Sequence, residues 1–100
     1  LTDFNDLCHN AYAASEYNEI VKNFEWVLID KIPVMDTSKL NEIRRFIQLI
    51  DIFYEARVGL AIVAAVDPQN LCKVKNLSFS FKRTASRIEE MCFPNWKDLY

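Results

Sequence analysis

Residues 26–66 read WVLIDKIPVMDTSKLNEIRRFIQLIDIFYEARVGLAIVAAV and hold two apolar segments separated by the best helical periodicity in the chain. The first seven residues of this stretch are mostly apolar, rich in β-branched side chains and stopped by Pro33, which is typical of a buried strand. Residues 59–66 have the same character and stop before Asp67 and Pro68. The two ends of the stretch therefore predict two buried strands.

The segment between these strands predicts a long helix, opened by Asp36, Thr37 or Ser38 and running to about Ala56. At 100° per residue its polar side chains fall in one narrow arc, formed by Arg44, Gln48, Asp51 and Glu55. Most of the remaining surface is apolar, so we expect packing on more than one side. Strand, helix and strand in this order predict two parallel strands with a right-handed crossover.

Further helices are expected on both sides of this unit. Ser15 or its neighbours can cap a helix with an apolar stripe at Tyr17, Ile20, Val21 and Phe24. Asp67 as N-cap and Pro68 as the first residue predict a short helix to Leu71 or Lys73.

The C-terminal third is expected to hold one more strand and one more helix. Residues 77–81 alternate and predict a short strand or extended stretch, and a helix is expected from Lys82 to Cys92, before Pro94. We find no repeat or linker and treat residues 1–100 as one unit.

Composition narrows the class of protein. The chain has 100 residues, 51% of them hydrophobic and 26% charged, as in a single globular domain. Its net charge of −2 argues against a nucleic-acid binder. Three dispersed cysteines and one histidine suggest neither a disulfide framework nor a metal site, and favour a reduced intracellular protein. No apolar run approaches the roughly 20 residues that span a bilayer.

The sequence contains a single glycine, Gly59. Phosphate-binding loops need glycine for close backbone approach, so neither a P-loop nor a GxGxxG motif is present. Asp30 ends an apolar strand, where a P-loop ATPase would hold its magnesium ligand, but Lys31 follows it and we interpret Asp30 as a strand-end or capping residue. Cys8 beside His9 lacks a third orienting group, so we expect no nucleophilic pair.

Arginines at helical spacing are the candidate functional residues. Arg83, Arg87 and Glu90 share one face of the last helix; a guanidinium there could bind a nucleotide phosphate. Spacing alone favours the plainer interpretation, an Arg87–Glu90 surface pair.

Arg44 and Arg45 point about 100° apart on the central helix. Arg45, beside Ile52, should be only partly solvated. An arginine in such a position could reach across to another subunit as an arginine finger. The alternative, favoured by spacing, is an intrahelical network of Arg44 with Gln48, Asp51 and Glu55.

Several motifs together resemble the C-terminal part of the ZapE-like cell-division ATPases and their mitochondrial counterparts, which are AAA-like P-loop ATPases. The motifs run from Phe4 to Met91 in a common order: Phe4 with Leu7-Cys8, Ala14-Ser15-Glu16-Tyr17, Val27 to Pro33, Arg44-Arg45-Phe46-Ile47, Leu49-Ile50-Asp51, Tyr54-Glu55, and Phe81 to Met91. This sequence departs from the family pattern at Glu16, Ile88 and residues 10–12.

The resemblance implies an α/β fold that is part of a P-loop-ATPase-like domain, with the last helix acting as a lid. It implies ATP and Mg²⁺ as cofactors of the intact protein, with Arg87 first and Arg83 second as phosphate contacts, and Arg44 or Arg45 at a subunit contact. The P-loop and acidic Walker B strand precede this region in the family. We therefore expect no catalytic or metal-binding residue in this chain alone, and a missing N-terminal nucleotide-binding half as its partner.

Two functions remain open. The first is a portion of an ATPase linked to cell division or mitochondrial protein quality control, located in the cytoplasm or alternatively in mitochondria. The second is a stand-alone interaction module derived from that fold, which would present an exposed apolar face and bind a partner, such as a cell-division protein, without nucleotide.

Overall fold

The computed structural model describes residues 2–4, 7–8 and 14–93. Within them, a sheet of three parallel strands has the order β1-β2-β3, formed by β1 (Thr2–Asp3), β2 (Trp26–Ile32) and β3 (Gly59–Ala64). The helices are α1 (Ala14–Asn23), α2 (Leu40–Glu55) and α3 (Ser78–Met91). Short 3₁₀ helices, η2 (Thr37–Lys39), η3 (Pro68–Asn70) and η4 (Lys75–Leu77), connect them.

The predicted crossover is confirmed: β2 and β3 pair in parallel, with Leu28 opposite Ala61 and Ile29 opposite Ile62, and α2 connects them. Asp36 starts the helical segment, as the sequence indicated. Its Oδ1 accepts hydrogen bonds from the Ser38 backbone at 3.0 Å and from the Ser38 hydroxyl at 2.6 Å. These bonds lower the pKa of the Asp36 carboxyl below its ordinary value.

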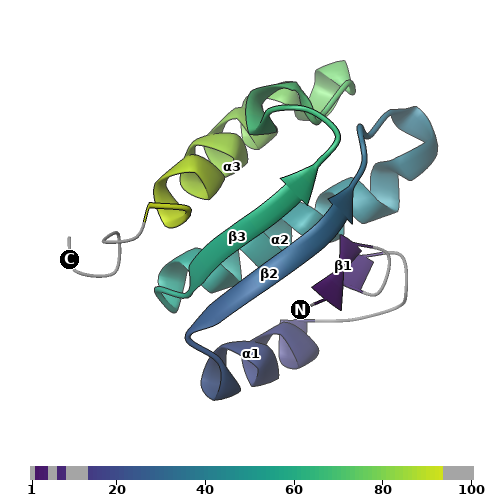
Figure 1. Ribbon diagram of the computed structural model, residues 1–100. Helices are drawn as coiled ribbons and strands as arrows, with labels where there is room; N and C mark the ends of the chain where they lie inside the picture. The colour runs from purple at the N-terminus through teal and green to yellow at the C-terminus, as the bar shows by residue number, and fades with distance from the viewer. Residues whose placement is uncertain (1, 5–6, 9–13, 94–100) are drawn as a thin grey trace.

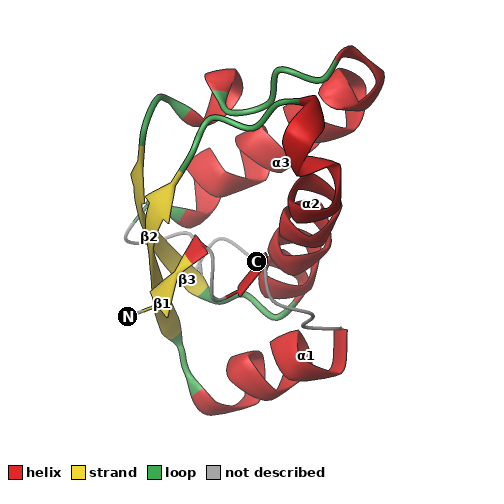
Figure 2. Cartoon of the chain, turned by 90° about the vertical axis from the view of Figure 1, so that its right-hand side faces the viewer, coloured by secondary structure: helices red, strands yellow, loops and turns green. Residues whose placement is uncertain are grey.

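All three α-helices lie on the same side of the sheet (Figures 1 and 2). Helix α2 is central, with contacts to both α1 and α3. Phe46 on α2 lies at the middle of the core: its ring centroid is 5.5 Å from that of Phe4 and 6.1 Å from that of Phe81. The prediction that α2 packs on more than one side is confirmed.

No helix among the described residues covers the opposite face of the sheet. On β2 and β3 the side chains alternate, so Val27 and Leu60 are buried while Trp26 is 47% exposed and Val63 is 55% exposed. The Trp26 indole lies over Gly59, where an added Cβ would clash with the ring. Thus a parallel sheet, normally covered on both faces, has helices on one side alone in the described structure.

The end of α2 uses a left-handed residue. Arg57 has φ 58°, its N–H donates to the Tyr54 carbonyl at 3.1 Å, and the Val58 N–H donates to the Phe53 carbonyl at 3.0 Å. This pair of bonds is a Schellman motif, in which glycine usually occupies the left-handed position. Here arginine occupies it, at some cost in backbone strain.

Three sequence predictions were wrong. Residues 77–81 are not extended: they belong to η4 and α3, which begins four residues before the predicted Lys82. Their alternation is misleading because Phe79 is 89% exposed while Phe81 is buried, as suits a helix face. Phe24 lies beyond α1 and is 59% exposed, and strand β1 was not predicted. His9, residues 10–12 and Pro94 lie outside the described residues.

Candidate functional site

Helix α3 carries the two arginines that the sequence selected as phosphate contacts. Ile88 and Ala85 are fully buried on its inner face, and Arg83 and Arg87, one turn apart, lie at the border of this face toward α2. The Arg87 side chain is 23% exposed and that of Arg83 is 61% exposed. Packing of α3 against α2 therefore fixes Arg87 more firmly than Arg83.

Asp51 on α2 forms ion pairs with both arginines. Arg87 donates to its Oδ1 at 2.5 Å, and Arg83 approaches its Oδ2 at 3.5 Å. The first is a charge-assisted hydrogen bond in a partly buried position, whereas the second is a long, exposed ion pair. Asp51 thus connects α2 to α3 mainly through Arg87.

Tyr54 adds two contacts to the same junction. The Arg87 guanidinium carbon lies 4.5 Å from the centre of the Tyr54 ring, within the range of a cation–π interaction. The Tyr54 hydroxyl donates to Glu90 at 3.0 Å. We call Asp51, Tyr54, Arg83, Arg87 and Glu90 the α2–α3 cluster.

The plainer sequence interpretations were wrong about partners. Arg87 was expected to pair with Glu90 on its own helix, but it bonds to Asp51, 36 residues away. Asp51 was expected in an intrahelical network with Arg44, yet its ion pairs go to α3. The role of Tyr54 was missed as well. Spacing along one helix reveals partners three or four residues apart, and could not reveal contacts between helices.

The remaining candidate arginines, Arg44 and Arg45, point in different directions, as predicted. Arg45 is half-buried and donates to the Cys8 carbonyl at 3.0 Å, so part of its hydrogen-bonding capacity holds the N-terminal segment. Arg44 is exposed and has no ion pair with a described residue. Of the two, Arg44 is the more accessible to another subunit.

Cys8 lies in a buried setting that suppresses thiol chemistry. Burial raises its pKa to about 12, although the neighbouring Tyr17 hydroxyl and Arg45 act in the opposite direction. Burial also raises the pKa of Tyr17, whose hydroxyl donates to the Leu7 carbonyl at 2.7 Å. A protonated, buried thiol is a poor nucleophile.

Asp30 supports a local backbone irregularity. Its Oδ1 accepts a hydrogen bond from the Lys31 N–H at 2.8 Å, and Lys31 has φ 58° where the β2–β3 register shifts. Asp30 therefore lies within β2, two residues before its end, and its side chain supports the irregularity there instead of ending the strand.

Residues 2–4, 7–8 and 14–93 contain neither a cluster of side chains that could hold a metal ion nor a helix that could cross a membrane. No group of three or more metal-ligating side chains comes together there. None of the helices in this part of the chain combines the length and apolar character that crossing a bilayer requires.

Comparison with known proteins gives the family. The model of the AFG1-like ATPase family matches residues 1–96. Cell division protein ZapE of Escherichia coli strain K12 is 36% identical over 88 residues, which cover 88% of this chain and 24% of ZapE. Lactation elevated protein 1 homolog B of Danio rerio is 34% identical over 61 residues, 61% of this chain and 12% of that protein.

This chain spans about a quarter of the length of ZapE. No solved structure matches significantly. The family match covers nearly the whole chain and confirms the resemblance drawn from the motifs. The chain belongs to the AFG1-like ATPase family.

Proposed function

We propose that this chain is the C-terminal portion of an AAA-like P-loop ATPase and acts by completing a nucleotide pocket whose phosphate loop lies in another part of the protein. Gly59 is the only glycine of the chain. It lies in β3, packed under the Trp26 side chain of β2, so it cannot belong to a phosphate loop, which supports this division. ATP and Mg²⁺ are the proposed cofactors of the intact protein.

The open sheet face is the observation that carries the proposal. The helices lie on one side of the sheet (Figure 2), and the alternating burial along β2 and β3 assigns the exposed side chains of Trp26, Ala61 and Val63 to the other side. Parallel sheets occur almost always with both faces covered. We assign the missing layer to the N-terminal nucleotide-binding half, which would remove these apolar side chains from water.

The two arginines of α3 have different proposed roles. Arg87 is already held by Asp51 and Tyr54, so it would present its remaining donors from a fixed position. Arg83 is more exposed and loses only a long ion pair when it turns toward a phosphate. Arg83 is therefore the arginine that can reach a phosphate at lower free-energy cost. Arg87 would offer only its remaining donors, from the position that Asp51 and Tyr54 fix.

The proposed contact between subunits uses Arg44, with Arg45 as the less accessible alternative because of its bond to Cys8. Cell division, suggested by the name of ZapE, and mitochondrial protein quality control are the proposed biological settings. The corresponding locations are the cytoplasm or, alternatively, mitochondria.

ATP turnover tests the proposal. The purified chain should show no magnesium-dependent hydrolysis of ATP. A chimera in which it replaces the matched 88-residue segment of E. coli ZapE should hydrolyse ATP, and Arg83→Ala or Arg87→Ala should slow the chimera at least 10-fold, whereas Lys22→Ala, a distant exposed change, should not. Robust hydrolysis by the chain alone would overturn the proposal.

A second candidate, a stand-alone interaction module, is also compatible with the exposed apolar face. The two functions differ in the behaviour of the isolated chain. A portion of a larger domain should self-associate or aggregate through the open face as concentration rises. An adapted module should remain monomeric over the same range, as measured by light scattering coupled to size-exclusion chromatography.

A further inference from the structure

Charge is distributed unevenly along this chain. Residues 68–88 contain five Lys or Arg residues and no Asp or Glu, although the whole chain has a net charge of −2. Two of the five, Arg83 and Arg87, are paired with Asp51. The remaining three, Lys73, Lys75 and Lys82, are exposed and form no ion pair with a described residue.

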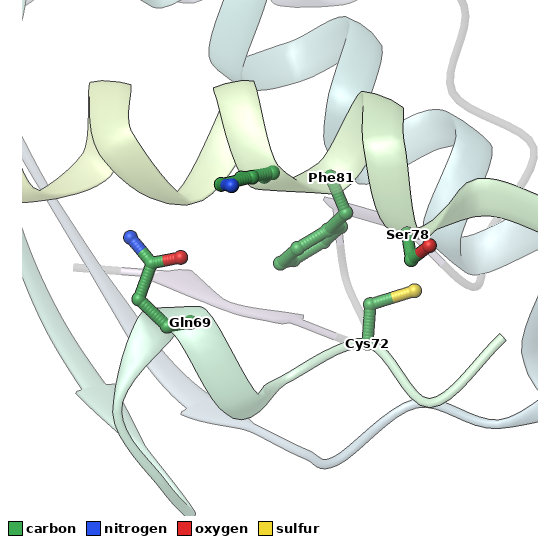
Figure 3. Close-up of a pocket in the computed structure, with 5 residues that line it drawn as sticks. Gln69, Cys72, Ser78 and Phe81 are labelled. Atoms are coloured by element: carbon green, nitrogen blue, oxygen red, sulfur yellow. The ribbon is translucent and has the colours of Figure 1, made fainter. Parts of the chain in front are cut away.

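These lysines belong to neighbouring elements. The Ser78 hydroxyl donates to the Lys75 carbonyl at 2.8 Å, which ties η4 to the start of α3. Lys82, one turn further along α3, lines a shallow pocket with Gln69, Cys72, Ser78 and Phe81. Figure 3 shows Gln69 and Cys72 on one side of this pocket and Ser78 and Phe81, from α3, on the other. Lys73 directly follows Cys72 in the chain.

Phe79 adds an aromatic side chain to this positive region. It is 89% exposed, the highest value among the exposed large hydrophobic side chains of the described residues. It lies three residues before Lys82, so the two share a helix face. Aromatic side chains at exposed positions are frequent anchors of protein interfaces. We call Lys73, Lys75, Phe79 and Lys82 the basic α3 surface.

The pocket beside this surface limits the kind of ligand. Its volume of about 190 Å³ is below the roughly 300–1,000 Å³ typical of small-molecule sites. An aromatic ring, a thiol, a lysine, an amide and a hydroxyl line it, and its small size suits one side chain of a larger partner, such as a protein segment. A nucleic acid is the alternative occupant that the test below distinguishes.

We infer that the basic α3 surface docks an acidic protein segment that carries an apolar anchoring side chain. The lysines attract the carboxylates and the pocket receives the apolar side chain, while Phe79, which does not line the pocket, adds exposed apolar contact area on the Lys82 side of α3. This partner is distinct from the nucleotide and from the layer proposed for the open sheet face, because none of these four residues belongs to the α2–α3 cluster, β2 or β3.

Peptide binding tests this inference on the purified chain. The probe is a fluorescein-labelled 12-residue peptide of glutamates with one central leucine, followed by anisotropy in 50 mM NaCl. Matched probes carry glutamine in place of glutamate, or are a 12-nucleotide oligothymidylate. The acidic peptide should bind at least roughly fivefold more tightly than either matched probe, and binding should weaken as salt rises.

Variants locate the binding surface. Lys75→Glu with Lys82→Glu should weaken binding of the acidic peptide roughly fivefold or more, and Phe79→Ser roughly threefold. The matched controls, Lys22→Glu and Phe93→Ser, change an exposed lysine and an exposed phenylalanine elsewhere and should have little effect. All changes are at exposed positions, and unchanged melting temperatures would verify folding.

Several results would overturn the inference. They are no binding of the acidic peptide, equal binding of the acidic and glutamine peptides, or equal losses in the control variants. Tighter binding of the oligothymidylate, lost in the same surface variants, would assign the surface to nucleic acid instead.

Discussion

Replacing Asp51 by Asn should destabilise the protein mainly by removing the charge that holds Arg87. The Asp51 side chain is 34% exposed and that of Arg87 is 23% exposed, so the pair lies between an exposed ion pair, worth about 0.2–1 kcal/mol, and a buried one, whose disruption costs about 3–5 kcal/mol. We expect a loss of about 2 kcal/mol. For a domain of this size that corresponds to a fall in melting temperature of about 8–16 °C.

Double-mutant cycles in urea, followed by far-ultraviolet circular dichroism, separate the two arginines. The cycle of Asp51→Asn with Arg87→Gln should give a coupling energy of about 1–2 kcal/mol. The cycle with Arg83→Gln should give less than about 0.5 kcal/mol because that pair is long and exposed. Arg44→Gln, on the same polar arc of α2, is the matched control and should not couple to Asp51.

A coupling to Arg83 equal to or larger than that to Arg87 would refute this ranking of the two arginines. So would a cost of Asp51→Asn below about 0.5 kcal/mol, the value of an ordinary exposed pair. Either result would mean that Arg87 is not held in place by Asp51, and that the α2–α3 cluster does not fix its position.

Arg57→Gly should raise the melting temperature by a few degrees because glycine relieves the left-handed strain, whereas Arg57→Ala should not, and equal effects would contradict this. Gly59→Ala should cost about 1–3 kcal/mol in urea unfolding because its Cβ meets Trp26, and much less in a Trp26→Ala background; an unchanged cost there would place the clash elsewhere. The pKa of Cys8 is raised from 9.0 to about 12 by folding, so its contribution to stability should be complete below pH 9 and lost between pH 9 and 12, and Cys8→Ala should reduce this dependence. In the native protein a thiol reagent should modify the exposed Cys92 and spare Cys8.

Much of the fold follows from local sequence patterns. Strand β2 matches its predicted limits because Pro33 ends a run rich in β-branched residues, and Asp36 supplies a capping oxygen to η2, which leads into α2 at Leu40. The start of α3 could not be predicted the same way, because the alternation of Leu77, Phe79 and Phe81 imitates a strand. Strand β1 has two residues, too few for any pattern.

The sequence indicated that Arg83 and Arg87 share one face of the last helix, but it did not predict their contacts with Asp51 and Tyr54. Helical spacing and the family motifs selected Arg83 and Arg87, which α3 does place one turn apart. Their partner Asp51 was assigned to its own helix because sequence spacing detects neighbours within one turn. The bond between Asp51 and Arg87 spans 36 residues and exists only after α2 and α3 pack together.

The central claim, that this region is one layer of a larger α/β domain, is tested most directly by the solvent exposure of Trp26. The measurement is acrylamide quenching of Trp26 fluorescence, with every other tryptophan replaced by phenylalanine, in the isolated chain and in the ZapE chimera. Trp26 is 47% exposed here, so quenching should be strong in the isolated chain and several-fold weaker in the chimera, where the second layer covers the sheet. Equal quenching in a folded chimera would contradict the claim.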